Sequence, residues 1–534
     1  MTFSRRAFLG SAALPVLGCA PERKVMGGFA GASAERGHLL RKPPASTGPP
    51  VDRRCDVLIA GGGIAGLSAA RALRQAGVED FALLELEDAA GGNSRPGRVG
   101  GIACPLGAHY LPVPGDSAEE VRDLLEELGV AKRAAGRWTY DERYLAHSPQ
   151  ERLFFNGRWQ EGLLPVQGVS ARTLDQYRLF SQRVGQAHKR ARFALPVRGA
   201  LPPSHRALDS LTFAAWLDRE KLDDEHLRWY LDYSCRDDYG AGIATVSAWA
   251  GLHYFASRHG FDAPGEAGER DALLTWPEGN GWLAERLAQP LEARLQAGRV
   301  VMRVAPLRQG VEVLAWNVAA NRMERWQAGH CILALPLFVA ARIMSTPPRP
   351  LADAVSRMRY ASWAVANVHI DRPLHDRPGA PPSWDNVIYG ARGLGYVDAG
   401  HQHVNPLPEP KVLTWYQALG DQPGAREQLL ARNWESWRDE VLDELSVPHP
   451  DLRARTLRVE VARYGHAMAV PVPGTRGSAA LAALRRPQAG MWRRVYFAHA
   501  DLSGYSIFEE AFTQGLRAAR AVLSDAGVTA KKGR

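Results

Sequence analysis

The sequence is poor in cysteine and has no long apolar run beyond its first 20 residues. Only five cysteines occur in 534 residues, and Cys55, Cys104, Cys235 and Cys331 show neither disulfide nor metal-ligand spacing. Cys331 lies in the apolar run 331–336 and is expected in the core. No later stretch reaches 18 consecutive apolar residues, so no transmembrane helix is expected. Internal repeats are also absent, which argues against a repeat architecture.

The net charge of +9 is concentrated at one end of the chain. Residues 1–54 hold nine basic and three acidic side chains, so this segment carries six of the nine net positive charges. The rest of the chain is therefore nearly neutral, which does not support a nucleic-acid footprint. A chain of 534 residues is also too long for one core, so two domains are expected.

The N-terminus resembles an export signal. Residues 4–9 (SRRAFL) resemble the twin-arginine motif, and the apolar run 7–18 is too short to span a membrane. Val16 to Cys19 resembles a lipobox, which would leave a lipidated Cys19 on a membrane surface; the alternative is cleavage nearby, at a small residue such as Ala20. We expect a signal peptide over 1–19, a flexible linker over 20–54, export by the twin-arginine translocase, and a periplasmic or cell-envelope location.

Residues 57–85 have the pattern of a dinucleotide-binding βαβ unit. An apolar strand runs into Gly61-Gly62-Gly63-Ile64-Ala65-Gly66, a helical stretch follows to Ala76, and a second apolar strand (81–84) ends on Glu85. Gly61 would make the tight turn, Gly63 would let the backbone approach a pyrophosphate, and Gly66 would let the helix pack on the strand. The helix N-terminus would face the phosphates, and Glu85 would take the ribose hydroxyls.

Further motifs at both ends of the chain resemble the flavin-containing amine oxidase superfamily. They are a glycine pair in residues 85–93, a turn at 105–110, a strand ending on an acid at 497–501, and a helix beginning near 508. The resemblance spans roughly residues 55–525 and implies FAD. Asn93 departs from the family's arginine, and Val304 resembles its adenine-side contact. The cofactor-binding residues expected from the βαβ pattern and the resemblance are Gly61, Gly63, Ile64, Ala65, Gly66, Glu85, Gly91, Gly92, Asn93, Gly107, Ala108, His109, Tyr110, Val304, Asp501 and Phe508.

The residues expected around the flavin differ from the family's usual set. Amine-oxidising members place a lysine on the strand that here spans 360–370, where Val365 or Ala366 stands instead. Ile507 stands where monoamine oxidases have an aromatic ring. The segment 463–471 has no cysteine, so FAD is expected to bind non-covalently. His466 in that segment is the candidate catalytic group, with a structural histidine as the alternative.

Three other groups of residues could have a functional role, but a structural role is favoured for each. Asp237 and Asp238 follow an aromatic-rich helix and could receive a cationic amine, although a polar turn that ends the helix is favoured. His253 and Tyr254 lie on a predicted helix and are expected in the core. His401-Gln402-His403 has no visible third ligand, so a solvent loop is expected and no metal site.

The motifs predict an α/β fold in which a substrate domain is inserted into a discontinuous cofactor domain. Residues 55–112, 270–340 and 462–528 would form a Rossmann-like, GR2-type FAD-binding domain, and 113–269 with 341–461 an α+β substrate domain. Helices are expected over 118–128, 170–193, 223–233, 283–297 (interrupted by Pro290) and 425–445. Strands are expected over 300–304, 311–316, 364–370 and 412–417.

The sequence thus predicts an exported FAD-dependent oxidoreductase that acts on a small organic substrate. The resemblance favours an amine or polyamine, oxidised by hydride transfer to the flavin. The electron acceptor, whether oxygen, a quinone or a protein, stays open. Two alternatives also stay open: a desaturase or isomerase of an apolar substrate, and a tethered flavin protein that relays electrons without turning over small molecules. A NAD(P)-linked reductase is disfavoured, because only one G-x-G-x-x-G fingerprint occurs.

Overall fold

The structure, a computed structural model, describes residues 24–45, 48–146, 150–258, 260–265, 272–401 and 409–527. The twin-arginine motif, Cys19 and His403 lie outside these residues. Within the described ranges no helix is both long enough and apolar enough to cross a membrane. The same ranges contain no group of acids, histidines and cysteines that could hold a metal ion.

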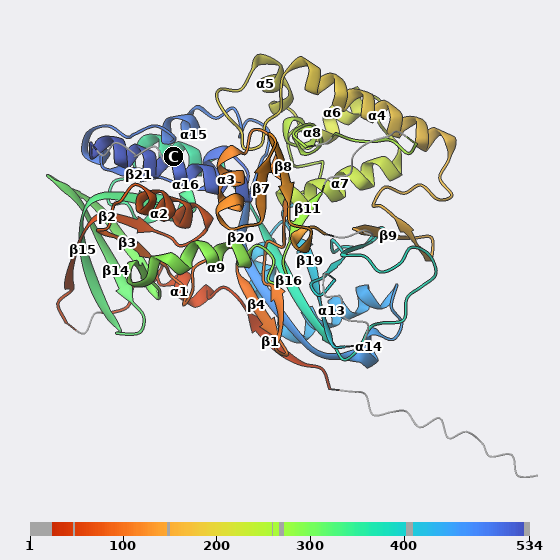
Figure 1. The fold of residues 1–534 in the computed structure, drawn as a ribbon, viewed down its shortest axis with the longest axis horizontal. Helices are drawn as coiled ribbons and strands as arrows, with labels where there is room; N and C mark the ends of the chain where they lie inside the picture. Colours follow the sequence, from red (N-terminus) through yellow and green to blue (C-terminus); the bar gives the residue numbers. More distant parts are fainter. Residues whose placement is uncertain are drawn as a thin grey trace, which may run out of the picture.

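A seven-stranded sheet forms one half of the molecule (Figure 1). Its central strand β2 is fully buried over residues 57–60, as expected of a parallel strand covered on both faces. β2 pairs in parallel with β3 and β15, and β13, β14 and β15 form an antiparallel meander. The strands are β12 (Leu295–Gln296), β3 (Phe81–Leu84), β2 (Val51–Ala60), β15 (Arg322–Leu333), β14 (Gly310–Asn317) and β13 (Arg299–Leu307), with β21 (Val495–Phe497) beside β15.

Two helices from opposite ends of the chain pack together in this half. They are α2 (Ile64–Gln75) and α16 (Phe508–Asp525). A Cβ on Gly515 would lie 2.0 Å from the Ala65 carbonyl oxygen, and the Ser68 hydroxyl donates to the Phe512 carbonyl oxygen at 2.7 Å. This close contact brings the C-terminal residues beside the first glycine turn.

An eight-stranded sheet forms the other half (Figure 1). Its long strands β16 and β20 pair antiparallel across the middle of the molecule. In sheet order the strands are β1 (Met26–Ala30), β20 (Thr456–Val470), β16 (Arg359–Ile370), β19 (Lys411–Ala418), β18 (Tyr396–Asp398), β17 (Asp385–Ile388), β9 (Glu151–Phe155) and β10 (Arg158–Glu161).

Helices cover this second sheet. One layer, at the upper right of Figure 1, consists of α4 (Ala171–Arg190), α5 (Pro203–Asp209), α6 (Phe213–Arg219), α7 (Glu225–Tyr239) and α8 (Ala248–Ala256). Its aromatic residues share one hydrophobic core with β16 and β19.

The remaining helices of the molecule are α1 (Ala34–His38), α3 (Glu119–Glu127), α9 (Gly281–Ala288), α10 (Leu337–Ile343), α11 (Arg349–Val355), α12 (Ala425–Ala431), α13 (Trp434–Ser446), α14 (Leu452–Arg455) and α15 (Ala479–Leu484).

Small two-stranded sheets and single turns of 3-10 helix complete the structure. The sheets pair β4 (Pro96–Val99) with β5 (Ile102–Pro105), β6 (Tyr110–Pro112) with β11 (Leu273–Thr275), and β7 (Ala131–Ala134) with β8 (Arg137–Tyr140). The 3-10 turns are η1 (Glu142–Tyr144), η2 (Gln289–Arg294), η3 (Gly490–Trp492) and η4 (Ala500–Ser503).

Most expected elements occur within a few residues of their predicted bounds, and one helix is wrong. The predicted helix 425–445 is two helices, α12 and α13, because the Asn433 side chain accepts a hydrogen bond from the Ser436 N–H and begins a new helix. The helix predicted from 283 is interrupted as expected at Pro290, where α9 gives way to η2.

The predicted domain limits need correction in two places. Residues 20–54 are not a flexible linker throughout, because β1 pairs with β20 and α1 forms in the same segment. β20 reaches from 456 to 470 and belongs to the second sheet, although residues from 462 were assigned to the cofactor domain. Both differences arise from long-range strand pairing, which no local pattern signals.

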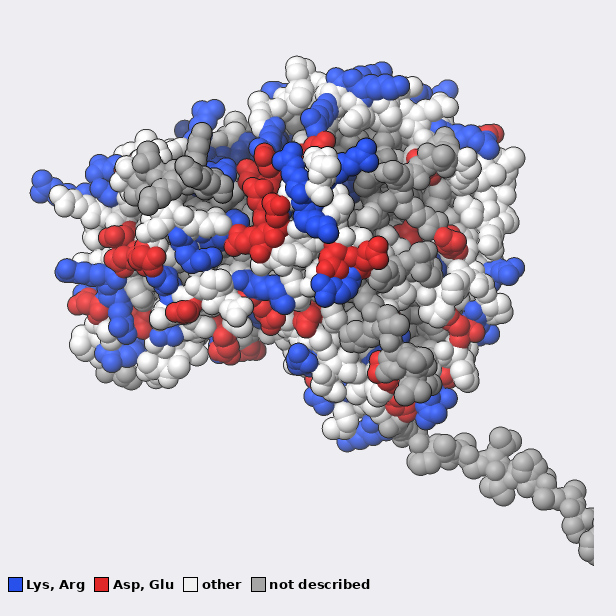
Figure 2. Space-filling view, viewed as in Figure 1, with Lys and Arg blue, Asp and Glu red and all other residues white. Residues whose placement is uncertain are grey.

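The surface charges are mixed, and the four described cysteines are buried. On the face shown in Figure 2, basic and acidic side chains are interspersed in small groups. Cys55, Cys104, Cys235 and Cys331 are buried and free, so they are core residues and not a disulfide framework. Burial raises the pKa of Cys55 to about 12, which makes this thiol unreactive.

Candidate active site

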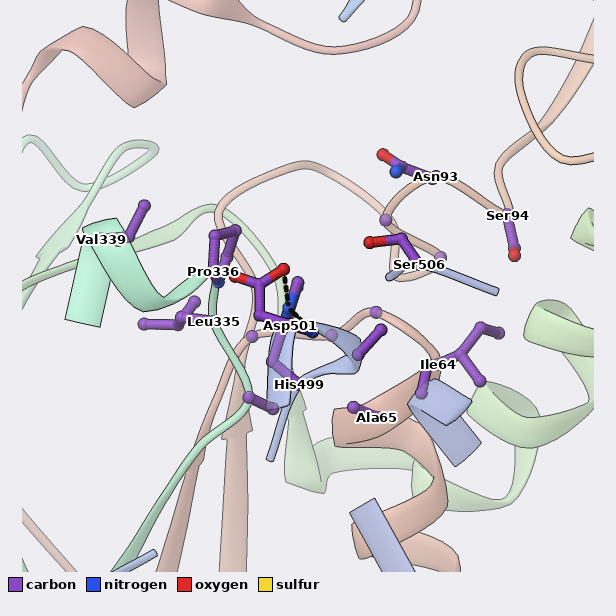
Figure 3. Close-up of a pocket in the computed structure, with 18 of the residues that line it drawn as sticks. Ile64, Ala65, Asn93, Ser94, Leu335, Pro336, Val339, His499, Asp501 and Ser506 are labelled. Carbon is purple, nitrogen blue, oxygen red and sulfur yellow. Dashed lines mark hydrogen bonds and ion pairs between the residues drawn. The ribbon is translucent and has the colours of Figure 1, made fainter. Parts of the chain in front are cut away.

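A cavity of about 310 Å³ lies where the first glycine turn, the 85–94 loop and the C-terminal segment meet (Figure 3). We call it the cofactor cavity. These segments meet because the parallel strands that precede them, β2, β3 and β21, end together with β15 at the same edge of the sheet. The carboxyl ends of parallel strands are the usual place for a bound dinucleotide.

Glycines let the backbone form the floor of this cavity. Gly61 adopts φ +102°, and a Cβ there would lie 2.3 Å from the Ala334 carbonyl oxygen. A Cβ on Gly66 would lie 1.9 Å from the Gly61 carbonyl oxygen, and one on Gly92 would lie 3.1 Å from the Gly63 Cα. The two glycine-rich turns therefore lie against each other, and side chains at these positions would obstruct them.

Glu85 ends β3 on the cavity wall. Its carboxylate accepts hydrogen bonds from the Gly62 N–H at 2.7 Å and the Glu87 N–H at 2.9 Å. Burial raises the pKa of Glu85, and the two N–H donors oppose that shift. The carboxylate is thus fixed beside the glycine turn, at the position predicted for ribose recognition.

Asp501 forms the opposite wall and is fully buried (Figure 3). Its carboxylate accepts hydrogen bonds from the Leu337 N–H at 2.9 Å and the Tyr360 hydroxyl at 2.6 Å, and His499 Nδ1 lies 3.0 Å from it. Burial favours the neutral acid, but these partners outweigh it and hold the pKa of Asp501 below its ordinary value. Asp501 therefore joins the C-terminal segment to the N-terminus of α10 and to β16.

The cavity fits the adenine dinucleotide that its motifs predict. The glycine turns offer backbone N–H groups at the start of α2, where phosphates bind. The Asn280 side-chain oxygen lines the cavity and, within the described part of the chain, is buried without a hydrogen-bond partner. A bound ligand with hydrogen-bond donors would satisfy it.

Most of the predicted cofactor residues lie together. Gly107, His109 and Tyr110 do not line the cofactor cavity but the adjoining cavity described below, and Gly66 packs against the turn. Val304 requires correction: it is fully buried in β13, and Val300 and Val301 line the wall instead. The predicted residues that line the cofactor cavity are Gly61, Gly63, Ile64, Ala65, Glu85, Gly91, Gly92, Asn93, Ala108, Asp501 and Phe508.

His466 lines the cofactor cavity and is partly exposed. Its ring lies 4.6 Å from the Phe338 ring, and partial burial with the nearby charge of Arg426 lowers its pKa to about 4. Two further cavities, described below, adjoin the cofactor cavity, and His466 is not among the described residues that line them. A catalytic role for His466 stays a prediction.

An inner cavity of about 160 Å³ adjoins the cofactor cavity, with which it shares Ala108, Asn280 and Phe508. Its wall is largely apolar and includes Val365 of β16 and Ile507, as the sequence suggested. No lysine is present among its described lining residues. Three carboxylic acids and one arginine also line this cavity: Asp237, Asp238, Glu509 and Arg258.

An outer cavity of about 350 Å³ continues from the inner one, with which it shares His109, Tyr110, Asp237 and Tyr416. The His109 ring stacks on Tyr416 with centroids 4.2 Å apart, and burial lowers its pKa to about 3, so it is neutral. Acidic and aromatic side chains predominate in the lining, which includes Glu151, Glu161, Tyr230, Tyr233, Asp237, Tyr254, Asp262, Trp384, Asp385 and Tyr416.

Asp237 and Asp385 are two acids of the outer cavity whose pKa values are raised, first of all by burial. The Tyr110 hydroxyl donates to Asp237 at 3.1 Å, and burial raises the pKa of Asp237 to about 7. Burial and then the charge of Asp237 raise the pKa of Asp385 well above its ordinary value. Arg258 is the only arginine or lysine among the described lining residues of both cavities, and it is paired with Asp238 at 2.9 Å.

These placements correct two predictions. The favoured interpretation of Asp237 as part of a polar turn that ends the helix is wrong, because α7 continues to Tyr239 and Gly240, at φ +76°, ends it. Tyr254 lines the outer cavity, whereas its neighbour His253 is buried as expected.

Asp385, Trp384 and Tyr416 were missed by the sequence analysis. They come from short strands that carry no motif, so only the alternation of side chains along β17 and β19 could have pointed to them.

Comparison with known proteins identifies the family. The family described as flavin-containing amine oxidoreductase matches residues 64–523. An L-amino acid dehydrogenase of Synechocystis sp. is 25% identical over 353 residues, 63% of this chain and 68% of that protein. A Mycobacterium tuberculosis protein named for a flavin-containing monoamine oxidase, AofH, is 26% identical over 312 residues, 58% of this chain and 63% of its own length.

Solved structures share the fold at low sequence identity. A putrescine oxidase aligns with a TM-score of 0.65 and 19% identity over 89% of this chain and 100% of its own. The cyclohexylamine oxidase of Brevibacterium oxydans aligns with a TM-score of 0.64 and 18% identity, covering 89% of this chain and 99% of its own. A fatty acid isomerase from P. acnes has a TM-score of 0.60 and 15% identity over 86% of this chain and 97% of its own. The cavity lined by the glycine turns, Glu85 and Asp501 is the candidate site for FAD, and the protein is an FAD-dependent oxidoreductase that belongs to the flavin-containing amine oxidoreductase family.

Proposed function

We propose that the protein oxidises a small cationic amine. The observation that supports this most directly is the pair Asp237 and Asp385 in the ring-lined outer cavity, next to the apolar inner cavity. Carboxylates and aromatic faces together attract an ammonium group. When bound, FAD would supply the redox chemistry by accepting a hydride equivalent from the carbon next to the nitrogen.

The chain's own residues would bind the amine and manage its proton. A hydride leaves an amine's α-carbon only when the nitrogen is neutral, so the ammonium proton must be removed. Asp237, whose pKa is about 7, can receive that proton on its carboxylate at neutral pH. The neutral His109 and Tyr416 rings would hold the substrate without competing for its charge.

The charge balance favours amines over amino acids. An amino acid brings a carboxylate that needs an unpaired cation. Arg258 is the only arginine or lysine that lines either cavity in the described part of the chain, and it is paired with Asp238. A second ammonium group, as in a diamine or polyamine, would instead find further acids such as Asp262 in the outer cavity.

Anaerobic reduction of the flavin tests this proposal. The FAD-loaded protein is mixed without oxygen with monoamines, diamines, polyamines and L-amino acids, and the flavin absorbance is followed. We expect bleaching by one or more amines and none by amino acids. Bleaching by dithionite alone would overturn the proposal in favour of a desaturase, an isomerase or an electron relay. Reoxidation in air, compared with reoxidation by a quinone, then identifies the electron acceptor.

We also propose that the protein is exported by the twin-arginine route and anchored through Cys19. The support is the sequence of residues 4–19. Replacement of both Arg5 and Arg6 by lysine should retain the protein in the cytoplasm, as measured by cell fractionation. Replacement of Cys19 by alanine should release it from the membrane fraction. A Cys19→Ala protein that stays membrane-bound would contradict the lipid anchor.

A further inference from the structure

Residues 24–42 form an ordered segment that precedes the part of the chain matched by the family, which begins at Ile64. We call this segment the strap. In Figure 1 its strand β1 runs along the edge of the eight-stranded sheet and its helix α1 lies beneath the other half. The strap therefore contacts both halves of the molecule.

The first anchor of the strap is β1. Five of its residues pair with β20 in a parallel register, from Met26 with Arg458 to Ala30 with Ala462. Gly27 adopts φ +148°, and a Cβ there would lie 1.8 Å from the Val459 carbonyl oxygen. Only glycine permits this approach, so the pairing depends on the chain's own sequence at this position.

The second anchor is the loop that follows Glu85. The Ser33 N–H donates to the Glu87 carboxylate at 2.8 Å. Arg36 donates to the Leu86 carbonyl oxygen at 3.2 Å and lies 2.8 Å from the Asp88 carboxylate. These contacts fix the position of residues 86–88. The Glu87 N–H in turn donates to the Glu85 carboxylate.

The third anchor is α10. The Arg342 guanidinium donates to the Leu40 carbonyl oxygen at 3.1 and 3.0 Å. The Leu40 side chain packs against the core of the cofactor half and lines the cofactor cavity together with Leu335 and Val339. Leu335 and Val339 appear on the same side of the cavity as Asp501 in Figure 3, and Leu335 also lies against the first glycine turn, because a Cβ on Gly61 would lie 2.9 Å from its Cδ2.

We propose that the strap, which contributes Leu40 to the wall of the cofactor cavity, slows the release of FAD. Its other contacts hold the loop after Glu85 and the helix after Pro336, so opening of the cavity on that side would require the anchors to release. The strap is also joined to the substrate-side sheet through β20. This inference concerns FAD alone and does not depend on which substrate is oxidised.

The rate of FAD release tests the strap directly. Full-length holoenzyme is diluted into buffer containing an apoflavoprotein that captures free FAD, and the rise or loss of flavin fluorescence is recorded. Arg36→Ala and Leu40→Ser should each increase the release rate by about tenfold or more, which corresponds to about 1.4 kcal/mol. Arg325→Ala and Leu307→Ser are matched controls, because both residues are partly exposed and neither lines the cavity. Release rates equal to those of the native protein in both strap variants would overturn the proposal.

Hydrogen exchange gives a second readout that does not require a variant. If the strap retains FAD, then FAD must stabilise the docked strap by the same free energy. Amides of residues 26–40 should therefore exchange more slowly in the holoprotein than in the apoprotein, while those of the remote strand β10 should not change. Equal exchange in the strap with and without FAD would contradict the inference even if a variant failed to fold.

Discussion

Asp385 is the residue whose role is easiest to test. No ion pair with Asp385 occurs among the described residues, and its carboxylate lines the outer cavity. If it binds a substrate cation, Asp385→Asn should raise KM for the amine by at least about tenfold, because a charge-assisted contact is lost. FAD binding should be unchanged. Steady-state or stopped-flow flavin reduction measures this effect.

The matched control for that variant is Asp353→Asn, an acid-to-amide change at an exposed position on α11. It should leave KM unaltered. An unchanged KM in Asp385→Asn would show that this carboxylate does not contact the substrate.

Asp237 should control the pH dependence of the reaction. Its pKa is raised by burial to about 7, so it is neutral below that pH and charged above it. If the anion attracts the substrate and accepts its proton, kcat/KM should increase as pH rises through about 7. Because Asp237 and Asp385 interact, the observed value belongs to the pair. This increase of kcat/KM with pH should disappear in Asp237→Asn. If the increase is retained in that variant, another group is responsible for it.

At the scale of elements, the first glycine turn has the strictest geometric requirement. Gly61→Ala would place a Cβ 2.3 Å from the Ala334 carbonyl oxygen as well as straining a backbone at φ +102°. We expect loss of FAD binding and a lower melting temperature, as measured by bound flavin and thermal unfolding. Gly77→Ala is the control: its φ is +81°, but nothing lies within 4 Å of the added Cβ. It should cost only the backbone strain, about 1–2 kcal/mol, and retain FAD.

Several helices and strands could be predicted from local signals, and their limits differ for definable reasons. Helix α7 continues six residues beyond its predicted end at 233, to Tyr239. It ends there because Gly240 adopts a left-handed conformation that terminates the helix. Asn433 divides the predicted helix 425–445, since its side chain caps a new helix. The glycine-rich residues 26–31 gave no strand signal, and they form a strand only because β20 offers an edge.

At the scale of the whole molecule, FAD should act as a structural link. The cofactor cavity is lined by β16 and β20 residues of the second sheet, Tyr360 and His466, as well as by the first sheet's loops. Ligand that binds only the folded state at a hundredfold excess over its Kd adds about 2.7 kcal/mol of stability. The holoprotein should therefore unfold at a temperature a few degrees higher than the apoprotein in calorimetry. Riboflavin, which lacks the pyrophosphate and adenosine, should give a smaller shift, and an equal shift would argue against a dinucleotide site.

The residues of the cofactor cavity could largely be predicted from local motifs. The glycine turn, Glu85, the second glycine pair and Asp501 could all be predicted, because their geometry follows from short segments with fixed spacing. Strand β2 and its partners likewise follow from apolar runs that need burial on both faces.

The residues of the outer cavity are brought together by packing between distant elements. Asp237, Asp385 and Tyr416 come from α7, β17 and β19, and they meet because those elements pack around one cavity. Leu40 reaches the cofactor wall for the same reason, through strand pairing between residues more than 400 positions apart. Side-chain convergence of this kind depends on packing between distant elements, and no local sequence pattern encodes it.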